Sequence, residues 1–202
     1  GSWPTNNYTV NSNVTVTLSN NYRDLLIRKG ANVTLTGTTF RTLRVEEGAT
    51  VTFTSATLNM ESLYAGTGLN TGIATLKFAD NTSVRVTEVV EVEERNNINP
   101  DNKKVTFYLG DANTDEEAFQ VKGNGTKVTA SVYIPNGEIS VQNCNNCAPI
   151  YMSGQFIAER IESGRNVIWN NNNCGAAPMV TTDDTAPVVV CPGAQQLCQS
   201  VS

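Results

Sequence analysis

This chain of 202 residues contains no histidine, and charged and aromatic residues make up only 16% and 7% of it. The absence of histidine excludes zinc sites that combine cysteine with histidine. No run of about 18 apolar residues occurs, so we expect no membrane insertion. Gly66-Thr67-Gly68 is not followed by the Gly-Lys-Ser/Thr of a phosphate-binding loop. The chain therefore lacks the residue patterns of several common cofactor and catalytic sites.

The charges that are present give no reason to expect a nucleic-acid partner. The formal net charge is −5, and lysines and arginines are scattered without a basic run. Nucleic-acid binding needs clustered basic side chains. Among the acidic residues, Glu91 and Glu93 alternate with Val90 and Val92 and therefore share the wet face of one strand. We interpret them as a solvated sheet edge that discourages aggregation.

Asparagine, threonine, valine and glycine are abundant, and these residues favour strands and turns over helices. The segment 30–36 realigns with the segment 48–54, and Ile27, Val45 and Leu63 repeat at the same step on a second face. Within each strand apolar and polar residues alternate, which places one side in a core and the other in water. Two short strands in each repeat describe one coil of a β-solenoid, which buries its apolar side chains against neighbouring coils.

We therefore predict an all-β fold, a right-handed β-solenoid of about nine coils with roughly 18 residues in each early coil. The solenoid domain would occupy residues 1–174. A β-sandwich is the alternative, because it also contains many short strands. The same repeat on two faces favours the solenoid.

Threonine pairs mark the outward side of the early strands. Successive pairs follow one another along the chain, and the residues are Thr15, Thr17, Thr34, Thr36, Thr52 and Thr54. We expect the three pairs to lie in stacked positions as a candidate surface for ligand contact. A regular Thr-x-Thr array resembles the surface of ice-binding solenoids, although threonine is also favoured on any exposed strand face.

Cysteines occur only in the last third of the chain. An all-cysteine zinc site needs two close pairs of cysteines, but Cys144/Cys147 and Cys191/Cys198 are far apart along the chain and the spacing within the second pair is too long. Disulfides in an exported protein are the better interpretation. Cys144 and Cys147 enclose two residues and could form a tight clamp, or either could join Cys174 one or two coils later. The sequence does not decide between these pairings.

One acidic segment partly resembles a calcium loop. In Asp111–Glu116, oxygen-bearing side chains recur at alternate positions, but the central glycine and the glutamate at position twelve are missing. The segment is compatible with a weak surface calcium site, and no other cofactor is expected.

The run from Val132 to Asn170 resembles a β-helical module of large bacterial surface proteins. Its motifs are Tyr133, Pro135, Gly137 and Ile139, then Gly154, Phe156, Ile157, Ala158 and Ile161, then Asn166, Val167 and Trp169. Residues 175–187 are rich in small residues, threonine and proline, which is typical of a linker. The tail from Asp183 to Cys198 resembles the start of the Ig-like (HYR-type) repeats in exported proteins of Bacteroidota, which implies that residues 188–202 begin an Ig-like module.

These resemblances imply a non-catalytic module of a large secreted or surface-anchored bacterial adhesin, located outside the cell. Its expected partners are polysaccharide or cell-surface glycan and neighbouring Ig-like modules of the same chain. One alternative is a dedicated polysaccharide-binding or ice-binding domain. The other is a polysaccharide-degrading β-helix, although the chain has no histidine for the Gly-His-Gly segment of pectinase-type helices and its aspartate pair, Asp183-Asp184, falls in the expected linker.

Overall fold

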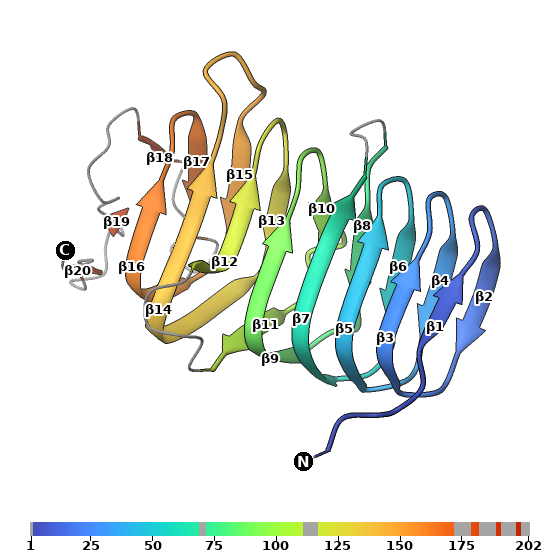
Figure 1. Ribbon diagram of the computed structural model, residues 1–202. Coiled ribbons are helices and arrows are strands. Elements are labelled where there is room, and N and C mark those ends of the chain that lie inside the picture. Colours follow the sequence, from blue (N-terminus) through green and yellow to red (C-terminus); the bar gives the residue numbers. More distant parts are fainter. Residues whose placement is uncertain are drawn as a thin grey trace.

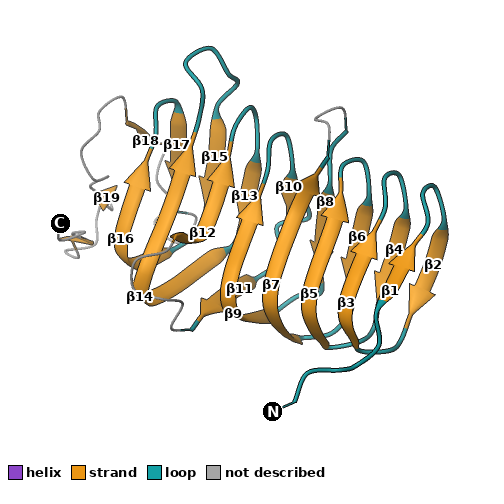
Figure 2. Ribbon diagram, viewed as in Figure 1, coloured by secondary structure: helices purple, strands orange, loops and turns teal. Residues whose placement is uncertain are grey.

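The computed structural model describes residues 2–68, 72–110 and 117–171, together with the backbone of three short strands further along the chain. The described part consists of strands and turns without a helix (Figure 2). The strands are β1 (Tyr8–Val10), β2 (Thr15–Leu18), β3 (Tyr22–Ile27), β4 (Asn32–Leu35), β5 (Thr39–Glu46), β6 (Thr50–Phe53), β7 (Thr57–Thr67), β8 (Thr75–Phe78), β9 (Thr82–Val92), β10 (Asn97–Ile98), β11 (Val105–Leu109), β12 (Glu117–Lys122), β13 (Lys127–Thr129), β14 (Ser131–Gln142), β15 (Ile150–Ser153), β16 (Phe156–Ser163), β17 (Val167–Asn170), β18 (Met179–Thr181), β19 (Val189–Val190) and β20 (Leu197–Cys198).

The chain winds between two facing sheets and forms a β-solenoid (Figure 1). Sheet A has the order β1-β3-β5-β7-β9-β11-β14-β12, with β16 also paired to β14. Sheet B has the order β2-β4-β6-β8-β10-β13-β15-β17, followed by β18. Strands consecutive in the early chain lie in opposite sheets and pair in parallel with the strands one coil away. This arrangement confirms the all-β solenoid and rules out the β-sandwich alternative, whose sheets are antiparallel.

The number of coils differs from the prediction. The solenoid has about six turns rather than nine. In sheet B, the positions equivalent to Val33 and Val51 in the later coils are Leu76, Ile98, Val128 and Met152. The steps between these positions are longer than the step from Val33 to Val51, whereas the last step of the column, from Met152 to Trp169, is shorter. The repeat seen in the sequence therefore holds only for the early coils, because the lengths of the later strands and loops vary from coil to coil.

The pairing of the first coil also differs from the prediction. The threonine repeat placed Thr15 beside Thr34, but Thr15 lies beside Asn32, and Thr17 lies beside Thr34. The observed register keeps Leu18 beside Leu35, where both are buried. The predicted register, shifted by two positions, would have kept the alternation but lost this apolar contact.

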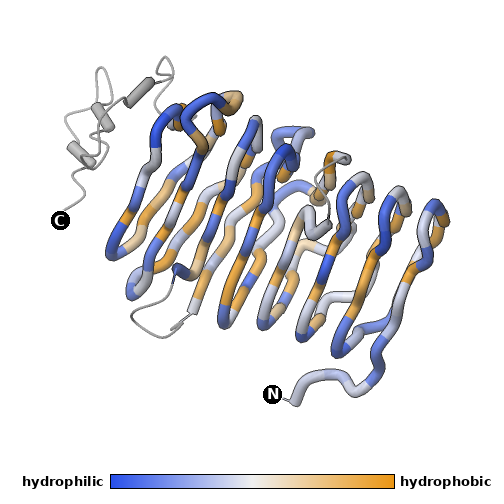
Figure 3. Tube along the Cα trace, turned by 45° about the horizontal axis from the view of Figure 1, so that its top comes forward, coloured by the Kyte–Doolittle hydropathy of each residue, from blue (hydrophilic) through white to orange (hydrophobic). Residues whose placement is uncertain are grey.

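Alternating side chains build the core between the sheets, and Figure 3 shows hydrophobic and hydrophilic positions alternating along the coils. Buried residues stack in columns along the solenoid axis, such as Leu25, Leu43 and Leu63 in sheet A. A second stack is aromatic: it contains Phe53, Phe78, Phe107 and Phe119, with successive ring centroids 4.9, 6.0 and 5.7 Å apart. Each coil thus buries its apolar side chains against those of its neighbours.

The long strands of sheet A are divided, along the strand direction, into an earlier and a later segment. Pairing shifts register between Met60 and Ser62 and between Ile134 and Glu138. β11 pairs with the first parts of β9 and β14, whereas β12 pairs with their later parts. We call the part aligned with β11 the first segment and the part aligned with β12 the second segment.

Buried asparagines fix the turns between coils. Asn96 and Asn99 are fully buried, and Asn96 donates to the carbonyls of Ala65 (3.2 Å) and Glu93 (2.8 Å). The Asn96 side-chain oxygen accepts a hydrogen bond from the backbone N–H of Ala74 at 2.8 Å. These bonds tie one turn to the neighbouring coil, so the abundant asparagines serve partly as hydrogen-bonded links between coils.

At the far end, β18 pairs antiparallel with β17, so part of the predicted linker lies against the last solenoid strand. β19 and β20 pair with each other. The predicted boundaries of the linker and the Ig-like module stay predictions. Within the described residues, no helix has the length and apolar character needed to cross a bilayer.

Candidate functional site

The threonine array is shorter than predicted. On the outer side of sheet B, Thr17, Thr34 and Thr52 form one column, and Lys77 takes the next position. Thr36 and Thr54 are exposed just after their strands, and the Thr54 hydroxyl donates to the Leu35 carbonyl at 3.2 Å. The six threonines therefore do not form two continuous columns of three. Any ligand contact by these residues stays a prediction.

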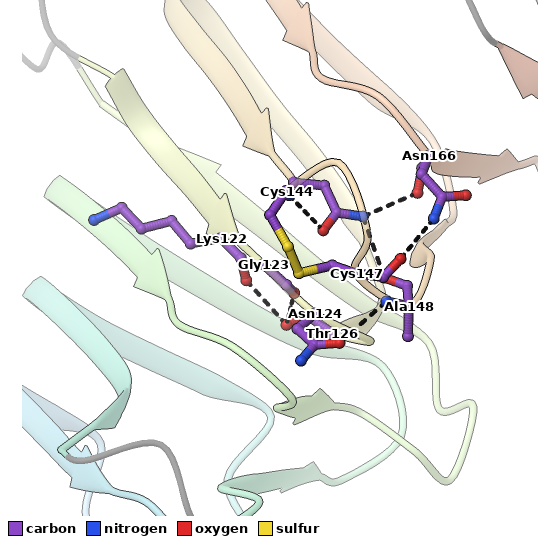
Figure 4. The surroundings of a disulfide bond; sticks show 9 residues. Lys122, Gly123, Asn124, Thr126, Cys144, Cys147, Ala148 and Asn166 are labelled. Carbon is purple, nitrogen blue, oxygen red and sulfur yellow. Dashed lines mark hydrogen bonds between the residues drawn. A yellow bond between two sulfur atoms is a disulfide. The ribbon is translucent and has the colours of Figure 1, made fainter.

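A disulfide joins Cys144 to Cys147 in the loop between β14 and β15, with the two Cα atoms 5.2 Å apart (Figure 4). This is the first of the two predicted pairings, and Cys174 lies outside the described residues. Asparagines anchor the loop to other coils: Asn166 donates to the Cys147 carbonyl at 2.8 Å, and Asn124 accepts from the Ala148 N–H at 3.1 Å. The disulfide loop is therefore held at both sides.

Beside this loop, the surface is hollowed between the ends of β14 and β16. The hollow has a volume of about 600 Å³, and it is lined mainly by polar side chains, among them Gln142, Asn143, Asn145, Glu162, Ser163 and Arg165. Arg165 donates to the Asn145 side chain at 3.5 Å. The amides, hydroxyls and charges of the lining suit a polar ligand better than an apolar one.

The outer surface of the first segment of sheet A carries a row of large exposed side chains. Arg85, Tyr108, Tyr133 and Ile157 occupy equivalent positions in β9, β11, β14 and β16. Tyr108, Tyr133 and Ile157 are 44%, 42% and 53% exposed, and Arg85 is exposed as well. We call these four residues the tyrosine row.

The two tyrosines of this row contact each other edge to face. Their ring centroids are 6.3 Å apart, with an angle of 65° between the ring planes. The buried residues on either side, Phe107 with Leu109 and Val132 with Ile134, hold both backbones in place. The row therefore offers apolar ring surface, phenolic hydroxyls and a guanidinium on a rigid support.

The alignment of these four residues could not be predicted from the sequence. Strand alternation indicates that Tyr108 and Tyr133 each point outward, because their neighbours are apolar. Their alignment depends on the lengths of the later coils, which follow no fixed period. No repeated motif marks the successive members of the row, so only the pairing of strands shows it.

The acidic pair Glu91 and Glu93 lies near the middle of sheet A and not at an edge, because β9 is flanked by β7 and by β11 and β12. Lys122 of β12 binds both carboxylates. Burial opposes ionisation of Glu91, but the hydrogen bond and charge of Lys122 outweigh it and lower the pKa of Glu91. Burial, together with the hydrogen bond to Glu91, raises the pKa of Glu93. The interpretation as a solvated edge is therefore wrong, and the pair is part of a cross-coil ion cluster.

The segment Asp111–Glu116, which suggested a weak calcium site, lies outside the described residues. Comparisons of the chain with protein-family models, with curated proteins and with solved structures find no match.

Proposed function

We propose that this chain is a non-catalytic module of a large secreted or surface-anchored bacterial adhesin, and that its tyrosine row contacts polysaccharide or cell-surface glycan. The observation that carries this proposal is the alignment of Tyr108 and Tyr133 in adjacent coils, both exposed, with Arg85 next to them. The adhesin assignment rests on the resemblance of residues 132–170 to β-helical surface modules.

Tyrosine suits contact with sugars because one side chain combines an apolar ring with a polar hydroxyl. Sugar rings present C–H groups on their faces and hydroxyls around their edges. Tyr108 and Tyr133 could contact successive sugar units, since neighbouring strands lie about 4.8 Å apart. Arg85 adds a cation that favours acidic polysaccharides.

The fold supports display as well as contact. The tyrosine row lies on parallel strands whose inward side chains pack against the core, so little conformational entropy is lost when a ligand binds. A site with two aromatic rings binds weakly by itself. Repetition of such modules along one adhesin chain would convert weak contacts into strong attachment.

The proposal is tested with a glycan array and with pull-down on insoluble polysaccharides. We expect the chain to bind at least one acidic or neutral polysaccharide, and Tyr133→Ala to weaken that binding by about fivefold or more. Tyr151→Ala is the matched control, because Tyr151 is similarly exposed (40%) but lies on sheet B. Equal binding by both variants would show that the tyrosine row is not the contact surface.

The same polysaccharide panel tests the non-catalytic part of the proposal. We expect no reducing-sugar release and no new ultraviolet absorbance, which would reveal hydrolysis or elimination. Turnover of any substrate would replace the binding function with the polysaccharide-degrading alternative.

A further inference from the structure

Three glutamates from three paired strands meet on the side of the second segment of sheet A that faces away from the core. Glu117 of β12 lies beside Glu138 of β14, and Glu162 of β16 lies two positions beyond Arg160, the partner of Glu138. One carboxylate oxygen from each glutamate lies within 4.8 Å of the corresponding oxygens of the other two. The three residues are far apart in sequence, so the solenoid itself creates the cluster.

Glu138 has an unsatisfied buried oxygen. The residue is only 5% exposed. Its Oε2 atom accepts hydrogen bonds from Nε (2.8 Å) and Nη2 of Arg160, whereas its Oε1 atom is buried without a hydrogen-bond partner. A buried carboxylate oxygen without a donor is costly, and native proteins rarely leave one unexplained. The same Glu138 carboxylate supplies an oxygen to the cluster with Glu117 and Glu162, so a cation that binds this carboxylate through both oxygens would satisfy Oε1 as well.

We propose that Glu117, Glu138 and Glu162 form a Ca²⁺ site. Ca²⁺ takes oxygen ligands at about 2.3–2.6 Å, so two ligands on opposite sides of the ion are separated by at most about 5 Å. The three carboxylate oxygens fall within that limit. Mg²⁺ demands shorter bonds and near-octahedral geometry, which three carboxylates on a rigid sheet meet less easily.

The charge around the cluster fits a divalent cation. Three carboxylates and one guanidinium give a net negative charge, because Arg160 binds Glu138 and lies 4.0 Å from Glu162. Gln142 donates to Glu117 at 3.3 Å and to Ser140 at 3.2 Å, which holds the Glu117 carboxylate toward the cluster. Glu162 is 57% exposed and lines the polar hollow, so the ion has access from solvent.

The site would join the strands that carry the hollow and part of the tyrosine row. A bound ion would link β12, β14 and β16 across their outer surface and oppose their separation. With three charged ligands and partial exposure, we expect a dissociation constant of about 10⁻⁴–10⁻³ M, as in extracellular calcium modules. This inference does not depend on glycan binding.

The experiment is isothermal titration calorimetry of the whole chain with CaCl2, compared with MgCl2. We expect one Ca²⁺ per chain and at least tenfold weaker Mg²⁺ binding. Glu162→Gln should weaken Ca²⁺ binding about tenfold or more, whereas Glu159→Gln should bind normally. Glu159 is the matched control because it is an exposed carboxylate on the same strand but outside the cluster.

Arg160→Gln separates a cation site from a purely structural ion pair. Removing the guanidinium should tighten Ca²⁺ binding, because the local negative charge increases, even if the variant is less stable. In differential scanning fluorimetry, millimolar CaCl2 should raise the melting temperature of the wild type and of Glu159→Gln, and should raise that of Glu162→Gln much less. Absence of Ca²⁺ binding by the wild type, or equal binding by Glu162→Gln, would overturn the site. Mg²⁺ binding as tight as Ca²⁺ binding would overturn the assignment of the ion.

Discussion

Asn99 and Thr129 are joined across adjacent coils: the Asn99 side-chain amide donates a hydrogen bond to the Thr129 carbonyl at 2.7 Å. The same amide donates to the Lys103 carbonyl at 2.7 Å, and its oxygen accepts from the Lys103 N–H at 3.1 Å. Asn99 is fully buried and its φ is +59°, in the left-handed region that asparagine tolerates well. One side chain thus closes a turn and links it to the next coil.

We expect Asn99→Gly to lower the free energy of unfolding by about 1–3 kcal/mol, because buried backbone groups lose their partners. Glycine adopts positive φ freely, so this variant isolates the loss of hydrogen bonds, and Asn99→Ala should be worse. Urea denaturation monitored by circular dichroism measures both. Asn97→Ala is the control, since the Asn97 side chain is only half-buried next to the buried Ile98, and it should change stability by less than about 0.5 kcal/mol.

The aromatic stack gives a second prediction, which compares two adjacent residues of β11. Phe107 is fully buried between Phe78 and Phe119, whereas Tyr108 is 44% exposed. Phe107→Ala should reduce the free energy of unfolding by about 3–5 kcal/mol, because it leaves a cavity in the core. Tyr108→Ala should cost less than about 1 kcal/mol. Similar losses in chemical denaturation would contradict the placement of Phe107 in the core.

Asp80 gives a prediction about pH. Its side chain accepts a hydrogen bond from the Lys104 backbone N–H at 2.9 Å, and this bond lowers the pKa of Asp80. A carboxyl whose pKa is lower in the folded state stabilises the fold above its unfolded pKa of about 3.9, and this contribution disappears as pH falls through the folded value. Asp80→Asn should therefore lower the melting temperature at neutral pH, and the difference should shrink below about pH 4.

The control for this prediction is Lys104→Gln, which removes the side-chain charge but keeps the backbone donor. Because the backbone hydrogen bond is the main cause of the lowered pKa of Asp80, most of the pH dependence should persist in this variant. Loss of the pH dependence in Lys104→Gln would mean that the lysine charge dominates.

The disulfide gives the last prediction. Replacing Cys144 and Cys147 by serine should reduce the free energy of unfolding by about 2 kcal/mol, because the closed loop is short. A reducing agent should lower the stability of the wild type by a similar amount and affect the double variant little. Peptide mapping without reduction should recover Cys144 linked to Cys147. A link from either residue to Cys174 would contradict the structure.

The early coils show how far the sequence predicts the fold. The regular repeat of Ile27, Val45 and Leu63 predicted stacked parallel strands in sheet A, and Ile27 does pair with Val45. The third position was wrong, because Val45 pairs with Ala65 and Leu63 lies beside Leu43. The prediction was wrong about the first threonine pair, because two registers that differ by two residues both keep Thr15 and Thr17 on the outward side of the strand. Burial of Leu18 beside Leu35 decides between them, and such a contact is visible only once the coils are stacked.

The candidate sites could be predicted only in part. Alternation places Tyr108 and Tyr133 on the outside, and the short spacing of Cys144 and Cys147 made a local clamp one of two options. The carboxylate cluster could not be found from the sequence. Its members lie on three strands that are distant along the chain, and the irregularity in β14 between Ile134 and Glu138 changes which residues face each other.

The sequence by itself determined the fold class of this protein. Its strands alternate apolar and polar side chains and repeat on two faces, and stacking in parallel coils buries these apolar faces. The tertiary structure alone decided the number of coils, the register of the first coil and the residues that meet on the outer surface. Local patterns set which way a side chain points. The length of each loop and the packing of each coil set which side chains from neighbouring coils lie next to one another.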